Sequence, residues 1–187
     1  MYNFYFLIPA LIPPPNFGFV EPDLYRSSIP TEVNFSFLQS LHLKTVIYLS
    51  LDTPPKIFND FLKEQGIDFC QIISGEGVNV GQHISEQHVL DALQIILTPE
   101  RYPLAVTCKT GMHRTGTVIG CFRKLQNWSL SNIIEEFRRY TGLKPSSMHE
   151  QFIELFDTDL VKIPSNEKDL PFAIPMSHKH QSLENDY

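Results

Sequence analysis

Two hydrophobic patterns alternate along this chain. Short apolar runs rich in β-branched and aromatic residues, typical of strands, separate longer segments in which apolar residues recur every three or four positions, typical of helices. The predicted strands cover residues 18–20, 24–26, 45–49, 67–73 and 104–106, and the predicted helices cover 35–41, 54–65, 85–98, 116–125, 129–142 and a segment from 147. This alternation predicts an α/β fold with a central, mostly parallel sheet flanked by helices.

Turn and cap residues predict some of the boundaries. Thr53 as a cap and Pro54 in the first turn predict the start of the second helix, and Gly66 predicts its end. The two short runs at 18–20 and 24–26 are separated by three turn-forming residues, so they predict either a hairpin or two edge strands.

The candidate chemistry lies between a predicted strand and a predicted helix. There, Cys108 is followed after five residues by Arg114. Five residues can curl the backbone so that successive N–H groups point at one tetrahedral anion, which would sit over the sulfur. The predicted phosphate-binding residues are Lys109, Thr110, Gly111, Met112, His113 and Arg114. In a parallel sheet, sites form at the carboxyl ends of strands, which is where Cys108 falls.

Three side chains of this loop have predicted catalytic roles. The converging amides and the following helix N-terminus favour negative charge, and therefore the thiolate form of Cys108, the nucleophile. Arg114 offers a permanent charge in a planar fork that holds two phosphoryl oxygens. Thr115 is placed to donate a hydrogen bond to the sulfur, which makes it a better leaving group when water attacks the intermediate.

The signature Cys-x5-Arg-Thr resembles that of the cysteine-dependent protein-tyrosine and dual-specificity phosphatases. The stretch from Cys108 to Trp128 is most similar to the atypical dual-specificity phosphatases of plants and fungi, and within them to the fungal oxidant-induced cell-cycle-arrest proteins. Further similarity at Pro14-Pro15-Asn16-Phe17, at Leu24-Tyr25-Arg26-Ser27 and at 135–142 extends the resemblance over residues 13–163. It implies a phosphatase fold and hydrolysis through a cysteinyl-phosphate intermediate, with no cofactor and no metal.

Thr107 and Arg26 also bear on the predicted site. Relatives commonly carry His before the catalytic cysteine, whereas this chain has Thr107, so we expect lower activity but not its loss. The resemblance also makes Arg26 a candidate anchor near the site, and the residues alone allow a solvated surface arginine equally well.

The general acid that would protonate the leaving oxygen has two candidates. Such phosphatases usually carry an aspartate in the loop over the site, but no aspartate lies between Asp68 and Asp91. Glu76 has the spacing to Cys108 usual in small relatives, and Glu86 stands where relatives have Asp after Pro. Burial could raise the pKa of either carboxylate. The simpler explanations are that Glu76 is a solvated charge in a loop and that Glu86 is an ordinary acidic residue in the first turn of a helix. A phosphoanhydride substrate would need no strong acid.

Charge and composition limit the function further. The net charge of −6 argues against nucleic-acid and acidic-membrane binding, so a polyanion must meet a local basic site. Three cysteines in 187 residues fit a reduced, cytoplasmic protein, with Cys70 and Cys121 as core side chains. The chain predicts an irregular apolar segment at 1–15, a phosphatase domain at 16–163 and a polar, flexible tail at 164–187.

The substrate stays open between two classes. Lys109, Arg114 and protonated His113 together give three cationic groups, which suits a polyanion. The resemblance implies either phosphoproteins, as for tyrosine and dual-specificity phosphatases, or the β-phosphate of diphosphoinositol polyphosphates. A weakly active, phosphate-binding relative is the third hypothesis.

Overall fold

The computed structural model describes residues 11–72, 84–142, 146–164 and 169–175. Its strands are β1 (Gly18–Glu21), β2 (Leu24–Ser28), β3 (Thr45–Tyr48), β4 (Asp68–Gln71) and β5 (Leu104–Cys108). Its α-helices are α1 (Phe35–Ser40), α2 (Lys56–Glu64), α3 (Glu86–Ile96), α4 (His113–Leu125), α5 (Leu130–Thr141) and α6 (Ser147–Leu155). Single turns of 3-10 helix cover Glu32–Asn34, Pro99–Arg101 and Thr158–Leu160.

The five strands form one sheet in the order β1-β2-β5-β3-β4. All neighbouring strands pair in parallel except β1, which pairs antiparallel with β2 at the edge. The predicted α/β fold with a mostly parallel sheet is confirmed, and the run at 18–26 is a hairpin. Every residue of β5 is buried, as expected for the middle strand of a sheet covered on both faces.

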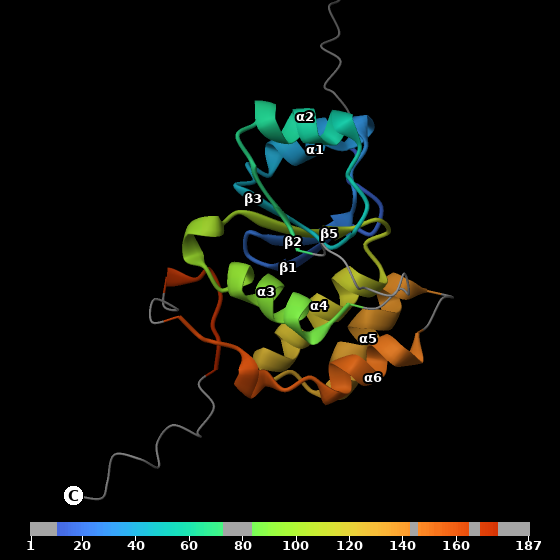
Figure 1. The fold of residues 1–187 in the computed structure, drawn as a ribbon, viewed down its shortest axis with the longest axis vertical. Helices are drawn as coiled ribbons and strands as arrows, with labels where there is room; N and C mark the ends of the chain where they lie inside the picture. Colours follow the sequence, from blue (N-terminus) through green and yellow to red (C-terminus); the bar gives the residue numbers. More distant parts are fainter. Residues whose placement is uncertain (1–10, 73–83, 143–145, 165–168, 176–187) are drawn as a thin grey trace, which may run out of the picture.

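Helices cover the sheet in two layers (Figure 1). On one face, α1 and α2 bury Leu38, Phe58 and Phe61 against alternate strand residues such as Val46 and Ala105. On the other face, helices α3 to α6 bury a larger apolar cluster. It includes Leu93, Phe122, Phe137 and Ile153 together with Ile47, Leu104 and Val106 of the sheet. Alternation along the strands therefore divides the core into two parts.

Two helix starts differ from the sequence prediction. Helix α2 begins at Lys56, after Pro55 with ψ 138°, and not at Pro54 with a Thr53 cap. Pro54 is itself followed by a proline, which disfavours helical backbone in the preceding residue. Helix α4 begins at His113, earlier than the predicted Gly116, because apolar spacing appears only further along this helix.

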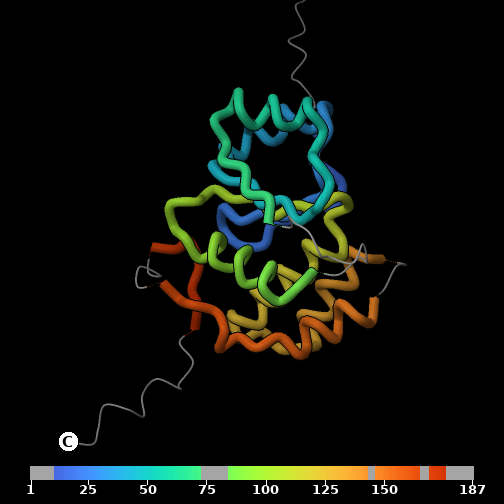
Figure 2. Tube along the Cα trace, in the orientation of Figure 1, coloured from blue at the N-terminus to red at the C-terminus, as the bar shows by residue number. Residues whose placement is uncertain are grey.

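Part of the segment expected as a tail packs on the larger cluster. Leu170 is buried there, and the Phe172 ring lies 5.8 Å from that of Tyr102 and 5.1 Å from that of Phe122. Figure 2 shows this segment, in red, beside the helical layer. Residues 176–187 lie outside the described part of the chain.

Candidate active site

The loop between β5 and α4 begins where the central strand ends. Cys108 is the last residue of β5, is 3% exposed, and its carbonyl accepts the N–H of Ile29 at 2.8 Å. The helix starts five residues later at His113, so the loop amides and the helix N-terminus lie on one side of the sulfur. The predicted strand-loop-helix setting of the cysteine is present.

Gly111 lets the loop close over the sulfur. Its φ of +69° is a left-handed conformation, and a Cβ at this position would stand 2.5 Å from the backbone nitrogen of Ser28. The N–H of Gly111 donates to the Cys108 sulfur at 3.2 Å. At least one loop amide therefore points inward, as the spacing predicts.

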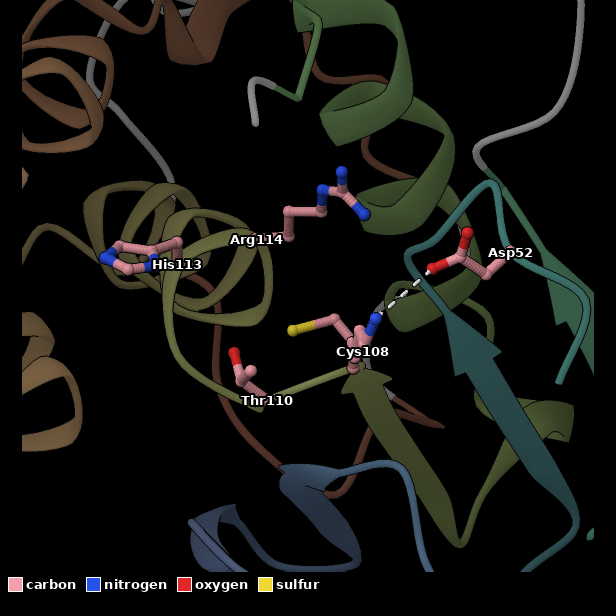
Figure 3. A pocket seen from close by; sticks show the side chains of 6 residues that line it. Asp52, Cys108, Thr110, His113 and Arg114 are labelled. Atoms are coloured by element: carbon pink, nitrogen blue, oxygen red, sulfur yellow. Dashed lines mark ion pairs between the residues drawn. The ribbon is translucent and has the colours of Figure 1, made fainter. Parts of the chain in front are cut away.

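Arg114 extends across the pocket from the first turn of α4. Its Nη1 donates to the carbonyl of Leu49 at 3.3 Å and lies 3.5 Å from the hydroxyl of Ser50, just beyond β3. Figure 3 shows its side chain extending from α4 on the side of the pocket above Cys108. The loop and the end of β3 together hold this charge in place.

A pocket of about 350 Å³ lies over the loop. It is lined by Asp52, Cys108, Lys109, Thr110, His113 and Arg114. The Lys109 ammonium is 4.0 Å from the Asp52 carboxylate, and their side chains are 76% and 68% exposed (Figure 3). Asp52 is not among the site residues predicted from the sequence. It closely follows β3, which pairs in parallel with β5, so the carboxyl ends of both strands lie at the same edge of the sheet. A carboxylate just after a predicted neighbouring strand is the sequence feature that could have indicated it.

His113 contributes less to the pocket than predicted. Figure 3 shows its ring turned away from the Cys108 sulfur. The ring lies 5.0 Å from that of His149 and 6.4 Å from that of Phe137, in helices α6 and α5. The cationic groups that face the pocket are therefore those of Lys109 and Arg114.

Thr115 and Glu86 do not show the contacts expected of them. Thr115 is fully buried, and its hydroxyl makes no hydrogen bond within the described residues, so the predicted bond to the sulfur is not made. Glu86 is the exposed first residue of α3 and is not among the residues that line the pocket. Glu76 lies outside the described residues.

Arg26 is a buried anchor and not a surface arginine. Its Nη2 donates to the carbonyl of Gly111 at 3.0 Å, and its guanidinium lies 3.5 Å from the centre of the Tyr140 ring. Burial lowers the pKa of Arg26 to about 10, so the group stays charged near neutral pH.

The hydroxyl of Thr107, where relatives have His, donates to the carbonyl of Ile47 at 2.9 Å.

The other two cysteines have no part in the site. All three cysteines are free, and burial raises the pKa of the Cys121 thiol, and likewise that of Cys70, which keeps both protonated near neutral pH. Within the described residues, no group of three His, Cys, Asp or Glu side chains could hold a metal ion. No described helix has the length and apolar character needed to span a membrane.

Several tyrosine phosphatases are similar to this chain over most of its length. The sequence model of the tyrosine phosphatase family matches residues 11–174. The Dictyostelium discoideum tyrosine-protein phosphatase DG1060 is 52% identical over 150 residues, which cover 80% of this chain and 90% of that protein. The Mycosarcoma maydis protein named tyrosine-protein phosphatase OCA1 is 49% identical over 152 residues, covering 81% of this chain and 96% of that one.

A solved structure supports the match over the whole fold. The core catalytic domain of PP-IP phosphatase SIW14 from S. cerevisiae has a TM-score of 0.74 at 43% identity, and the match covers 81% of this chain and 91% of that one. The resemblance predicted from the signature loop is confirmed.

Proposed function

Because this chain belongs to the tyrosine phosphatase family and is a cysteine-dependent phosphatase, we propose that it removes the β-phosphate of a diphosphoinositol polyphosphate. The observation that carries this proposal is the charge of the pocket. Lys109 and Arg114 line it beside Cys108, in a chain of net charge −6. Two cations at one open site favour a substrate with several negative charges over a single phosphate ester.

In the proposed mechanism Cys108 is the nucleophile. Its thiolate attacks the β-phosphorus, an S–P bond forms, and the bond from phosphorus to the bridging oxygen breaks. Arg114 and the N–H groups of residues 109–114 hold the three equatorial oxygens as charge redistributes. Water then attacks the phosphocysteine, which releases inorganic phosphate and restores the thiolate.

The leaving group decides whether an acid is needed. In an anhydride the departing oxygen belongs to a second phosphate, which is stable as an anion near neutral pH. Asp52, the one carboxylate among the described lining residues, is highly exposed and faces Lys109. Glu76 and Glu86 stay predictions as general acids, and the proposed substrate does not require them.

A phosphotyrosine protein is the second candidate substrate. The names of the relatives at 52% and 49% identity, both tyrosine-protein phosphatases, favour it. A phenolic leaving group is a stronger base than phosphate, so this reaction would depend on a proton donor. Three free cysteines support a reducing compartment such as the cytoplasm for either reaction.

Phosphate release from three substrates tests the proposal. A diphosphoinositol polyphosphate, a phosphotyrosine peptide and a small aryl phosphate are compared at matched concentrations, with Cys108→Ser as the control. We expect the highest kcat/KM with the first, and loss of turnover in Cys108→Ser by about 10⁴-fold or more.

Two results would contradict it. A higher kcat/KM for the peptide would make the protein a phosphotyrosine phosphatase. Equal, negligible release by the wild type and Cys108→Ser from all three substrates would leave a phosphate-binding protein without turnover.

A further inference from the structure

Two consecutive carbonyl groups of the loop accept hydrogen bonds from side chains of the N-terminal hairpin region. Nδ2 of Asn16 donates to the carbonyl of Thr110 at 2.8 Å. Nη2 of Arg26 donates to the next carbonyl, that of Gly111, at 3.0 Å. Both donors are remote in sequence from the loop, and neither residue lines the pocket.

Because a peptide group is planar, these two bonds also orient N–H groups that can bind an anion. In a trans peptide group the carbonyl of one residue and the N–H of the next point in opposite directions. Holding the carbonyls of Thr110 and Gly111 in these two bonds therefore fixes the directions of the N–H groups of Gly111 and Met112, each opposite to the carbonyl of its own peptide group. The N–H of Gly111 accordingly donates to the Cys108 sulfur at 3.2 Å, and the N–H of Met112 lies 3.4 Å from the hydroxyl of Thr110, a residue that lines the pocket.

Asn16 is itself held in a fixed turn. Its φ is +55°, a left-handed conformation that asparagine tolerates better than most residues. The carbonyl of Pro15 accepts the N–H of Ser28 at 2.8 Å, and the ring of Phe17 lies 4.8 Å from that of Phe37. The turn is therefore fastened to β2 on one side and to α1 on the other.

Arg26 is held between the sheet and α5. It pairs with Val106 of β5, is 1% exposed, and its guanidinium lies against the ring of Tyr140. A Cβ on Gly18 would stand within 2 Å of the Tyr140 hydroxyl, so the absence of a side chain there makes room for this ring. The guanidinium is therefore held both by the Tyr140 ring and by the Gly111 carbonyl of the loop.

From this arrangement we infer that Asn16 and Arg26 are positioning residues, which orient two loop peptide groups so that the N–H groups of Gly111 and Met112 bind the substrate's phosphoryl oxygens. The inference rests on the proposed phosphoryl transfer at Cys108, but it concerns the binding of any tetrahedral oxyanion by the loop. Neither side chain touches the substrate.

The variant Asn16→Gly tests the first of these bonds. Glycine adopts a φ of +55° without strain, so the substitution removes the donor and keeps the turn. We expect kcat for the aryl phosphate to fall roughly tenfold, because misdirected donors lose part of their stabilisation of the transition state. The melting temperature is expected to change little. Asn16→Asp, which keeps the shape and removes the donor, is expected to lower kcat at least as much.

Asn34→Ala is the matched control. The Nδ2 of Asn34 donates to the carbonyl of Ile12 at 3.1 Å, so this side chain also fastens the N-terminal segment but does not reach the loop. An equal fall of kcat in Asn34→Ala and Asn16→Gly would overturn the inference, since general loosening of the segment would then explain both. Unchanged kcat in both Asn16 variants would overturn it as well.

Binding of tungstate, a tetrahedral oxyanion, provides a readout that needs no turnover. In the Cys108→Ser protein, tungstate is expected to shift the amide resonances of Gly111 and Met112, and Asn16→Gly and Arg26→Lys are each expected to weaken its binding about tenfold. Undiminished affinity in both variants would contradict the inference. Tungstate binding can be measured even if no substrate under 'Proposed function' is turned over. The positioning roles of Asn16 and Arg26 are therefore tested independently of the proposed substrate.

Discussion

The pocket has a buried floor and an exposed rim, and the two differ in how they are held. The floor consists of Cys108, which is 3% exposed, and the half-buried Arg114, with Gly111 of the same loop packed behind them. Its atoms are fixed by hydrogen bonds to the sulfur, to Leu49 just beyond β3 and to Arg26. The rim consists of Asp52 and Lys109, whose charged groups face each other at 4.0 Å in solvent.

This difference suggests that the floor stabilises the transition state of phosphoryl transfer and that the rim discriminates between substrates. Fixed donors in a buried site stabilise developing charge strongly, and they act on the phosphoryl group that every substrate shares. Exposed charges are screened by solvent and salt, so each contributes little binding free energy. They contact the part of the substrate beyond the phosphoryl group, which differs from one substrate to another. We expect floor substitutions to lower kcat for all substrates and rim substitutions to change KM for some.

The largest effect among the variants that keep the nucleophile is expected for Arg114→Lys. Lysine keeps the positive charge but lacks the planar fork that holds two oxygens. We predict that kcat falls on the order of 10²- to 10³-fold with both an inositol pyrophosphate and an aryl phosphate. Arg139→Lys, at an exposed arginine paired with Glu135, is the matched control and should leave kcat unchanged. A fall confined to one substrate would place Arg114 with the rim.

A smaller and selective effect is expected for Lys109→Ala. The variant removes one exposed cation from the mouth of the pocket, worth up to about 1 kcal/mol to a charged partner. We therefore predict that KM for the diphosphoinositol polyphosphate rises about fivefold while kcat is retained, and that KM for the aryl phosphate hardly changes. The difference should shrink in high salt. An equal rise of KM for both substrates would argue against separate roles for floor and rim.

The smallest effect is expected for Asp52→Asn. Removing this carboxylate frees Lys109 from its partner and removes a charge that repels anions. The account predicts a two- to threefold lower KM for the inositol pyrophosphate, with roughly unchanged kcat. Steady-state kinetics at low salt measure this. A large loss of kcat would instead mean that Asp52 donates the proton to the leaving group.

The elements of the fold and the floor of the site could be predicted from local sequence. The central strand and the signature loop are contiguous, so Cys108, Gly111 and Arg114 carry their spacing in the sequence itself. The strands and helices follow from apolar periodicity, which is also a local signal. Helix α4 was predicted to begin too late because its first turn carries polar residues and a glycine instead of apolar ones.

The rim and the supports of the loop could not be predicted in this way. Glu76 is predicted from its spacing to Cys108 and Glu86 from its place in relatives, whereas Asp52 reaches the pocket because it follows the neighbouring strand β3. The burial of Arg26 depends on Gly111 and Tyr140, which are distant in sequence. The ring of His113 lies 5.0 Å from that of His149 in α6, a contact that no local pattern encodes.

The most direct test of the central claim is to trap the phosphorylated enzyme. The protein is mixed briefly with a diphosphoinositol polyphosphate carrying a radioactive β-phosphate, quenched in detergent at neutral pH, and digested to locate the label. The account predicts label on the peptide that contains Cys108, and none in the Cys108→Ser protein. Turnover that persists in Cys108→Ser, or rapid turnover with no label on that peptide, would contradict the cysteinyl-phosphate mechanism.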